Sequence, residues 1–590
     1  MSINAWDEVD WTLVESRVSR LQSRIYLASL NGENGKVHYL QKKILKSSDA
    51  KYLAVRRVTQ INKGKISAGI DKQRNLTNEQ RHLLAQELRV TGTARPIRWK
   101  MISKPGKTEK RPLGISTIHD RALQQLVRLA LEPEWEAKFE PNSYGFRPGR
   151  SCHDAIGAIF STNRAKHLYV IDADIRKCFD QINHEKLLNK LDTFSEMRNQ
   201  ICAWLEAGVM EGYAKSPKEQ DKAAPNTIGT PQGGVISPLL ANIALHGLES
   251  DVKTYYVNNL YTGSSSIAVR DRRRQVSVIR YADDFVVLHK DERTIHSLKA
   301  YIAKWLHANA GLELSEEKTN IKSTKEGFNF LGFHIISIPK GVDKVKCKIH
   351  VSRNSKNKLL QKTSSILRNN RSASPEAIIM LLNPIIVGWC NYFRYAECVT
   401  DFKQVEYSLF GQLRKWVFRR KSKGIKSKKR LKERYFPSNT KVMFRGTEHT
   451  GNWILVGKIH ARGQKADEAP GRQITLVYPS WIKSEFWVKI QGNKSPYNRE
   501  NLYWAKRNPK HCRWNARTIK LVRGQEYKCP ICEQLFTEDS TIEIDHVKPI
   551  ALGGEDTTSN IQAVHDYCHS AKTRIDRKII KQQKSDGPNK

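Results

Sequence analysis

The stretch Ile279-Arg-Tyr-Ala-Asp-Asp-Phe-Val-Val-Leu288 sets two adjacent acids inside an apolar, β-branched run. In an extended strand, neighbouring side chains point to opposite faces of the sheet. Asp283 and Asp284 can therefore share one site only at a hairpin turn, with residues 276–281 and 285–288 as its arms. Two carboxylates at close range repel each other, so the stretch predicts a cation between them. Mg²⁺ is expected because it binds carboxylates and substrate phosphates together.

A second acidic stretch offers the third carboxylate that a two-metal site needs. Residues 168–175, LYVIDADI, are typical of a buried strand. Asp172 and Asp174 have the same parity in this strand, so either could face the site. Two metals held in this way polarise a phosphate and activate an attacking hydroxyl, which fits nucleotidyl transfer to a 3′-hydroxyl. An Asp-Asp pair alone is more often a solvated turn, but the apolar flanks and the second acidic strand favour a site here.

The charge of the chain indicates a polyanionic partner. The 590 residues include 101 basic and 59 acidic side chains, a formal net charge of +42. Nucleic acid is the expected partner, and an anionic membrane surface is the alternative. The most apolar window, residues 378–389, is short and interrupted by Asn383 and Pro384, so we expect no membrane span. The length predicts roughly three to five domains.

The cysteines and the first residues bear on the compartment. Ten cysteines are scattered along the chain, with one tight pair at Cys529 and Cys532. This usage is typical of a reducing compartment with one metal site, and not of a disulfide scaffold. The first residues, MSINAWDEVDW, are acidic and lack an apolar core, so we expect no secretory signal.

Ordered blocks along the chain resemble the reverse transcriptases encoded within group II introns. The blocks are RPLGISTIHDRALQQLVRLALEPEWEAKFEPNSYGFRPGRS (111–151), DADIRKCFDQINH (172–184), GTPQGGVISPLLANIALHGLE (229–249), RYADDFVVL (280–288), LELSEEKT (312–319), FLGFHI (330–335) and LNPIIVGWCNYFRYA (382–396). Ser116 stands where the family usually has proline, a minor change at a turn.

The resemblance implies a multidomain α+β fold built around a right-hand polymerase. Residues 1–335 would form an N-terminal extension with the fingers and a palm that carries an antiparallel sheet. Residues 336–435 would form a helical thumb and maturase domain. Separately, interleaved aromatic and basic residues over 436–500 predict DNA contact within a region 436–505, with a small folded module that has a solvated basic face as the alternative. The polar and basic composition near 495–510 predicts a linker there. Residues 506–590 would form a zinc-stabilised ββα-metal domain of the HNH type.

The resemblance also assigns roles in the polymerase site. Asp174, Asp283 and Asp284 would be the catalytic acids that bind Mg²⁺, and Asp172 would be structural. The implied substrate-binding residues are Lys104 and Arg111 for the triphosphate, Phe179 against the incoming sugar, Gln232 near the template, Arg147 for template phosphate, and Lys318.

From the residues alone, each of these assignments has an alternative. Phe179 could be a core side chain, and Lys104 and Arg111 could be ordinary surface charges. Arg150, like Arg147, could contact template phosphate. In the same segment, Ser151 and Asp154 form an equally good capping box for a purely structural helix start. In residues 233–238, two glycines permit close backbone approach, and a Ser-Pro pair predicts a helix start.

The last eighty residues carry a second cluster of potential ligands. Cys529 and Cys532 have metal-knuckle spacing, and His565 with Cys568 could complete a four-ligand zinc site. The order of Asp545, His546, Asn560 and His569 between and after them resembles the HNH nuclease motif. His546 would deprotonate a water, Asn560 would orient that imidazole, and Asp545 with His569 would hold a divalent metal.

Two alternatives remain open for this cluster. A zinc knuckle without cleavage is the simpler interpretation, although the complete order of residues favours a nuclease. Cys512 or His569 could replace His565 as the fourth zinc ligand, and in the second case the nuclease metal would lose a ligand.

The resemblance implies a reverse transcriptase and maturase that binds its parent intron RNA and assists splicing. It would nick target DNA and copy the inserted intron from the cleaved 3′ end, with dNTPs as substrates and no membrane. We expect it in the cytoplasm or nucleoid of a bacterium, with an organelle as the alternative. The competing hypotheses are an RNA-binding splicing cofactor with idle sites and a DNA-repair polymerase with a nuclease tail.

Overall fold

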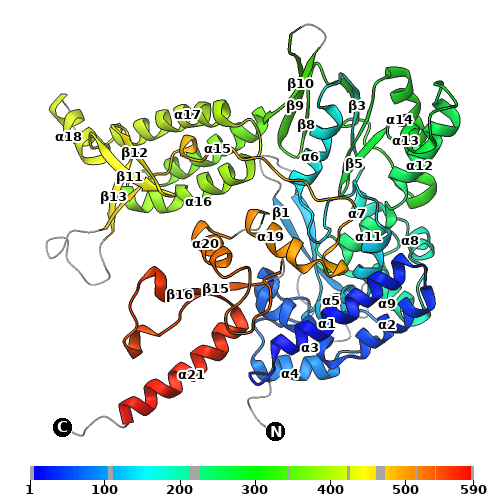
Figure 1. Cartoon of the computed structure of the whole chain (residues 1–590), viewed down its shortest axis with the longest axis horizontal. Coiled ribbons are helices and arrows are strands. Elements are labelled where there is room, and N and C mark those ends of the chain that lie inside the picture. Colours follow the sequence, from blue (N-terminus) through cyan, green and yellow to red (C-terminus); the bar gives the residue numbers. More distant parts are fainter. Residues whose placement is uncertain are drawn as a thin grey trace.

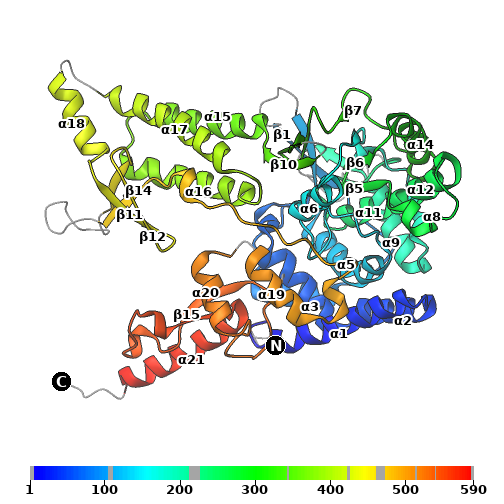
Figure 2. The ribbon, with the colours of Figure 1, turned by 45° about the horizontal axis from the view of Figure 1, so that its top comes forward.

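The computed structural model describes residues 6–103, 110–211, 226–341, 344–420, 425–459, 472–511, 514–537 and 540–585. Two residues singled out above, Lys104 and Cys512, lie outside these ranges. Residues up to about 350 form one large part of the molecule. An arm of helices (green to yellow) and a C-terminal part (orange to red) extend from the same side of it (Figures 1 and 2).

The N-terminal helices pack around one long, buried helix. They are α1 (Trp11–Leu30), α2 (Asn34–Lys46), α3 (Ser48–Arg56), η1 (Arg57–Ile61), η2 (Lys63–Ile66) and α4 (Asn78–Glu87). Helices α1, α2 and α3 contact α5 (Ile118–Lys138), and α4 packs on α3. Even the polar residues of α5 are largely buried: Glu134 accepts a hydrogen bond of 2.6 Å from Gln41. This helical layer therefore forms a fixed base under the sheets.

A four-stranded antiparallel sheet carries the acidic stretches. Its order is β5-β6-β3-β7, from β3 (Tyr169–Asp174), β5 (Ser277–Tyr281), β6 (Asp284–His289) and β7 (Asn320–Ser323). Alternate residues of β3 and β6 enter two different hydrophobic cores: Ile171 and Val287 face one, and Val170 and Val286 the other. Since both faces are covered, these strands read as continuous apolar runs in the sequence.

Two smaller sheets and several helices complete the large part. One sheet has the order β2-β1-β4, from β1 (Ile97–Ser103), β2 (Lys110–Ile115) and β4 (Val209–Glu211), and the other has the order β10-β9-β8, from β8 (Phe328–Phe330), β9 (Phe333–Pro339) and β10 (Val345–Val351). The helices are α6 (Cys152–Asn163), α7 (Cys178–Gln181), α8 (His184–Leu191), α9 (Ser195–Glu206), α11 (Ser237–Ala244), α12 (Leu248–Tyr255), η3 (Tyr256–Leu260), α13 (Val269–Arg273) and α14 (Glu292–Ala310). The expected strand at 168–175 is confirmed to within one residue at each end, as are the hairpin around Asp283 and Asp284 and the helix start in residues 233–238.

In the residues that the structure describes, the arm contains four helices and two pairs of antiparallel strands. The helices are α15 (Arg353–Asn369), α16 (Pro375–Phe393), α17 (Val399–Phe418) and α18 (Ile425–Tyr435), and the strands are β11 (Thr440–Phe444), β12 (Thr447–Gly451), β13 (Val456–Ile459) and β14 (Arg472–Thr475). Among the described helices, α16 is long and apolar enough to cross a membrane, by length and composition alone. In its most apolar stretch, 33% of the residues are buried. Asn383 within it bonds to the backbone of Thr475 and Val477, both at 2.9 Å, and so joins α16 to the strands beside it.

The chain then returns to the large part before it enters the C-terminal part. Its elements are η4 (Pro479–Trp481), η5 (Pro496–Asn498), α19 (Asn501–His511), α20 (Ala516–Gly524), β15 (Ile542–His546), η6 (Ile550–Leu552), η7 (Thr558–Asn560), β16 (Ile561–His565) and α21 (Asp566–Ser585). The expectation of a linker near 495–510 is wrong for the residues described there, because Ser495, Trp504 and Arg507 are buried.

One buried arginine joins the N-terminal helices to the C-terminal part. Arg56 donates to both carboxylate oxygens of Asp566 at 2.8 Å and pairs with Glu15 at 3.2 Å. Its guanidinium also lies over the rings of Trp11 and Tyr567. The first turn of α21 is thereby held against α1 and α3.

Candidate active sites

The hairpin at the end of β5 and β6 brings the acidic stretches together. Tyr281 pairs with Asp284, so Ala282 and Asp283 form a two-residue turn, with Ala282 at φ 60°. Asp284 in turn lies directly opposite Asp174 across the β6–β3 ladder. Directly opposed residues of antiparallel strands project from the same face of the sheet. The structure thus gathers all three predicted acids at one end of the sheet.

The electrostatics of this cluster favour a cation. Loss of surrounding water, followed by repulsion from Asp283 and Asp174, raises the pKa of Asp284 to about 7. Burial and repulsion from Asp174 also raise the pKa of Asp283. Lys318 lies 2.5 Å from Asp174 and its pKa is raised by that hydrogen bond. Asp284 keeps an exposed surface, so a cation from solvent can reach it. A bound cation would remove the repulsion among the three carboxylates.

Asp172 lies two residues before Asp174 in β3, farther from the turn. It shares the sheet face of Asp174 but stands opposite Val286 and Asn320, away from the turn. Its carboxylate pairs with Lys322 at 3.5 Å, and burial raises its pKa. The position fits the structural role that the resemblance implies.

A cavity of about 490 Å³ opens between β1 and β2, Phe179 and the loop before α11. Three predicted substrate-binding residues line it: Arg111, Phe179 and Gln232. One of them, Arg111, lies near enough to the acidic cluster for its charge to oppose the rise in the pKa of Asp283. The Arg111 guanidinium donates to the Gln232 side-chain oxygen, and the Gln232 amide donates to Asp180 at 3.0 Å. Phe146, which the sequence did not indicate, meets Phe179 edge to face at 6.1 Å. Phe179 also packs against the core, and its role against the incoming sugar stays a prediction.

One glycine shapes the cavity wall. Gly233 has φ +116°, and a Cβ there would lie 2.5 Å from the Gly114 carbonyl oxygen. No other residue type combines that backbone conformation with so close an approach. The expectation of close backbone approach at this loop is confirmed at Gly233.

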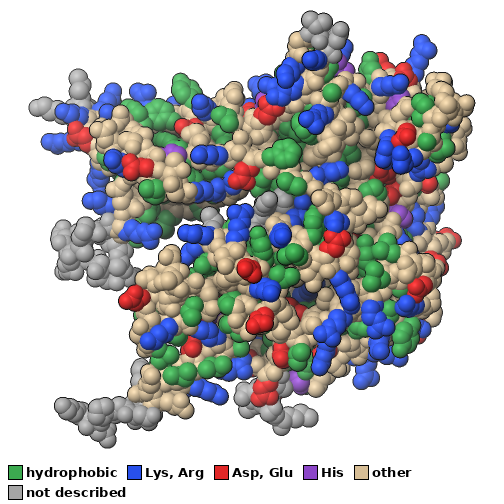
Figure 3. Space-filling view, in the orientation of Figure 1, with side chains coloured by type: hydrophobic (Ala, Val, Ile, Leu, Met, Phe, Trp, Pro, Cys, Tyr) green, Lys and Arg blue, Asp and Glu red, His purple; other side chains and the backbone are tan. Residues whose placement is uncertain are grey.

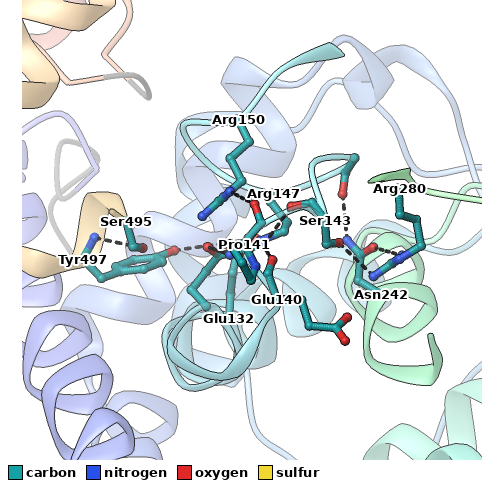
Figure 4. Close-up of polar contacts among 12 residues, drawn as sticks. Glu132, Glu140, Pro141, Ser143, Arg147, Arg150, Asn242, Arg280, Ser495 and Tyr497 are labelled. Carbon is teal, nitrogen blue, oxygen red and sulfur yellow. Dashed lines mark hydrogen bonds and ion pairs between the residues drawn. The ribbon is translucent and has the colours of Figure 1, made fainter. Parts of the chain in front are cut away.

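The expected contact of Arg147 with template phosphate is wrong. Its side chain is 1% exposed and donates to both carboxylate oxygens of Glu136, at 2.8 and 3.0 Å, and to the carbonyls of Glu140 and Ser143 (Figure 4). Arg150 is also buried and donates to the Pro141 carbonyl. Both guanidiniums hold the loop between α5 and α6 and face no solvent. The capping box of Ser151 and Asp154 is confirmed.

Another buried arginine, Arg280, holds the hairpin turn. Arg280 donates to Asn242, to the Ser143 hydroxyl and to the Ala282 carbonyl, at 2.9, 2.8 and 3.2 Å (Figure 4). Asn242 donates to the Gly145 carbonyl at 2.8 Å. A Cβ at Gly145 would lie 2.3 Å from the Ala282 nitrogen, so the loop touches the turn directly. These supporting residues lie inside the quoted sequence blocks, but no pattern in the sequence indicated their contacts.

The C-terminal part contains a ββα arrangement of the predicted nuclease residues. β15 ends at Asp545 and His546, pairs with β16, and is followed by α21. Asp545 Oδ1 lies 3.7 Å from His569 Nε2, which leaves room for a shared cation. The other oxygen of Asp545 is 3.1 Å from Lys572, a contact that sequence reasoning missed.

The Asn560 side chain is bonded to the loop that follows His546 and not to the imidazole itself, so its expected role in orienting this imidazole stays a prediction. The Asn560 side chain bonds to the backbone of Lys548 and Glu555 and so pins the loop after His546. Asp556 instead lies 3.2 Å from His546 Nε2. The histidine therefore has an acidic partner from the loop that Asn560 shapes.

Four residues form a compact candidate metal site. The ligand atoms of Cys529, Cys532, His565 and Cys568 all lie within 4.8 Å of one another. Hydrogen bonds from Cys532 and Cys568 hold the pKa of the Cys529 thiol well below its ordinary value, whereas hydrogen bonds with Cys529 and Cys532 raise the pKa of the Cys568 thiol. Among the described residues, His565 belongs to this cluster, whereas His569 lies 3.7 Å from Asp545. His565 therefore stays the predicted fourth ligand; the alternative Cys512 lies outside the described residues.

The chain matches four family models, each over one segment. The model described as reverse transcriptase (RNA-dependent DNA polymerase) matches residues 102–335, and the N-terminal domain of reverse transcriptase matches 6–88. The group II intron, maturase-specific domain matches 356–436, and HNH endonuclease matches 529–574. The acidic cluster and the cavity lie in the first of these segments, and the ββα arrangement lies in the last.

Known proteins align with large parts of the chain. Protein YkfC of Escherichia coli (strain K12) is 31% identical over 48% of this chain and 78% of its own length. The group II intron-encoded protein LtrA of Lactococcus lactis subsp. cremoris is 28% identical over 59% of this chain and 68% of its own. Maturase-like protein 1 of Euglena gracilis is 26% identical over 66% and 77%.

Proposed function

Because this chain belongs to the group II intron-encoded reverse transcriptases and maturases that carry an HNH endonuclease domain, we propose that its two active sites act in sequence on one DNA target. The protein is an RNA-directed DNA polymerase and an HNH DNA endonuclease. The nuclease nicks the target DNA, and the polymerase extends the resulting 3′ end with intron RNA as template. This is retrohoming by target-primed reverse transcription.

In the polymerase, we assign Asp174, Asp283 and Asp284 as Mg²⁺ ligands. Their carboxylates suit a hard divalent cation, and their mutual repulsion, evident in the raised pKa of Asp284, disappears when one binds. When bound, Mg²⁺ neutralises phosphate charge and activates the 3′-hydroxyl. The two strands hold Asp174 and Asp284 in fixed positions, and Lys318 is placed to approach the nucleotide phosphates from beside Asp174.

The cavity beside this site takes the incoming nucleotide. Phe179 stacks against its sugar and excludes a 2′-hydroxyl, which selects deoxynucleotides. Arg111, together with Lys104, binds the triphosphate, since a guanidinium can contact phosphate oxygens in pairs. Gln232 lies beside Arg111 and contacts the template side of the new base pair. Residues up to 335 then correspond to fingers and palm, residues 336–435 to the thumb, and residues 436–505 to a DNA-binding region.

In the nuclease, His546 removes a proton from the attacking water. Asp556 lies against its imidazole and stabilises the charge that forms. Asp545 and His569 hold the divalent metal, which is proposed to be Mg²⁺ and which neutralises the scissile phosphate. Zn²⁺ is proposed for Cys529, Cys532, His565 and Cys568, because a closed thiolate and imidazole set suits a structural zinc.

The RNA partner is proposed to be the parent intron. Lys428, Lys429 and Arg430 of α18 are exposed on the arm, and Lys and Arg side chains are spread widely over the face in Figure 3. Such a surface binds structured RNA through its phosphates more than through its bases. By analogy with LtrA, we place the protein in the bacterial cytoplasm or nucleoid.

The observation that carries the proposal is the pairing of Asp174 with Asp284 beside the turn at Asp283. It is tested with protein, intron RNA and a supercoiled target plasmid. His546→Ala should abolish both the nick and the cDNA, and a pre-nicked plasmid should restore the cDNA. Asp283→Ala should leave the nick and abolish the cDNA. Splicing assistance without nick or cDNA in the unmutated protein would instead support a splicing cofactor with idle sites.

A further inference from the structure

Residues 487–507, here called the strap, lie between the segments matched by the maturase and HNH models. The strap leaves the arm, crosses to the large part of the molecule and ends in α19 (Figures 1 and 2). It is packed there against the loop between α5 and α6, residues 139–151, and against the start of α6. The question is what this docking does for the protein.

In the first contact, the strap neutralises a buried carboxylate at the start of α6. Asp154 is 0% exposed, and its Oδ1 accepts hydrogen bonds from Trp487 Nε1 at 3.0 Å, Ile490 N at 2.8 Å and Arg507 at 2.7 Å. Its Oδ2 accepts from Ser151 N at 3.0 Å. A buried charge is tolerated only when it is paired and fully hydrogen-bonded. The start of α6 therefore depends on a cation that arrives from more than three hundred residues downstream.

The second contact is steric. The Trp504 ring lies directly on Gly149, where a Cβ would be 2.5 Å from the ring. Trp504 is 5% exposed, and its Nε1 donates to the Ser495 carbonyl at 3.1 Å. Tyr497 donates to Glu132 of α5 at 2.9 Å (Figure 4). The strap thus closes over both the loop and the helix from which the loop starts.

The same loop holds the polymerase turn from its other side. Arg280 N donates to the Asn142 carbonyl and Tyr144 N donates to the Arg280 carbonyl, both at 2.9 Å. The Arg280 guanidinium reaches Ser143 and Ala282, and Gly145 rests on the Ala282 backbone. Only a few residues separate Gly145, which meets the turn, from Gly149, which meets the strap. A shift of the loop would therefore also displace the Ala282–Asp283 turn and with it the Asp283 carboxylate.

We infer that the strap is a positioning element of the polymerase site: Arg507 and Trp504 fix the loop, and the loop fixes the Ala282–Asp283 turn. This inference rests on the proposed function of Asp283 and Asp284 as polymerase metal ligands. A metal site that is misplaced by about 1 Å loses about a hundredfold in rate. The strap thereby makes polymerisation depend on a segment outside the matched reverse transcriptase domain.

The test uses the full chain and single-nucleotide addition to a DNA primer on an RNA template. Arg507→Met should lower kcat by about tenfold to a hundredfold with little change in the dNTP KM. Hydrogen exchange of residues 277–289 should rise in parallel. Arg507→Lys keeps the charge and should recover most of kcat. The matched control is Lys506→Ala, which removes an exposed charge from the same helix and should leave kcat and exchange unchanged.

A second variant covers the case in which Arg507→Met does not fold. Asp154→Asn with Arg507→Gln removes both buried charges together and leaves polar groups that can still pair. It should fold, as shown by its melting temperature, and still have a reduced kcat. The inference is overturned if either folded variant matches Lys506→Ala in kcat, or if kcat falls without increased exchange at 277–289. Asp283→Asn distinguishes a failure of this inference from a failure of the proposed function. Unchanged nucleotide addition in that variant would contradict the proposed role of Asp283 as a metal ligand.

Discussion

The polymerase and nuclease sites are assembled in opposite ways. The polymerase acids come from β3 and from the β5–β6 turn, more than a hundred residues apart, and meet through strand pairing. The nuclease residues lie between Asp545 and Lys572 on consecutive elements. The first site needs a correctly folded large core, whereas the second is a local unit.

This difference extends to what stabilises each site. The polymerase sheet is buried between two extensive cores, and its turn is held by Arg280 and the loop at Gly145. The core of the nuclease part is small, and two of its buried members, Cys529 and Cys568, belong to the candidate metal site. A domain with so small a core usually needs a metal to fold. The comparison predicts that the two sites can be broken separately.

The largest effect is expected from removing one polymerase ligand. Asp174→Asn should reduce primer extension by about a thousandfold or more, because several kcal/mol of transition-state charge stabilisation are lost. Nicking of target DNA by the same variant should stay within about twofold of the unmutated protein, since the sites share no residues. Primer extension within tenfold of the unmutated rate would show that Asp174 binds no catalytic metal.

The next effect is the loss of the metal site of the nuclease part. Cys529→Ser should abolish zinc binding and nicking together, because structural zinc supplies about 10–16 kcal/mol of folding free energy in small domains. Zinc content by mass spectrometry and plasmid nicking measure the two. Primer extension should persist. Cys202→Ser, which changes a partly exposed cysteine outside the site, is the matched control. Full zinc content in Cys529→Ser would argue against the four-ligand assignment.

A smaller effect is expected from the support of the polymerase turn. Gly145→Ala places a methyl group 2.3 Å from the Ala282 nitrogen, so the turn has to move. Primer extension should fall by about a hundredfold, the cost of a misplaced catalytic group. Gly411→Ala in α17 is the control, since nothing lies within 4 Å of its Cβ. Equal rates for the two variants would mean that the loop does not position the turn.

The smallest effect is expected from changing Asp172, and it distinguishes the role of Asp172 from that of Asp174. Asp172→Asn removes a partly exposed ion pair with Lys322, a contact worth about 0–1 kcal/mol. Primer extension should fall by less than about fivefold. Steady-state kinetics at varied Mg²⁺ concentration should show an unchanged Mg²⁺ dependence. A large increase in the Mg²⁺ requirement would make Asp172 a metal ligand and reopen the choice between the two acids.

Sequence reasoning was most successful where function requires particular residue types at fixed spacing. The Asp283–Asp284 hairpin and the close approach of Cys529, Cys532, His565 and Cys568 are as expected. Arg111 and Gln232 line one cavity, and their binding roles stay predictions. Sequence reasoning failed for Arg147. An arginine in a basic motif looks the same whether it faces phosphate or pairs with a buried glutamate, because only its surroundings decide.

The strap illustrates the same limit on a larger scale. Its polar and basic composition predicted a linker, yet Trp504 and Arg507 are buried against a loop that is distant in sequence. A polar and basic composition indicates that a segment can be exposed to solvent. It does not reveal whether another part of the chain, here the loop at residues 139–151, packs against that segment.

The sequence by itself determined the chemistry of this protein: which acids, histidines and cysteines are present, and in what order. Local periodicity and turn geometry were enough to predict the hairpin and the metal knuckle. Only the tertiary structure decided which charged groups are buried, how Arg280 and Gly145 support the turn, and where the strap docks. The physical reason is that burial and pairing depend on long-range contacts, which no local pattern encodes.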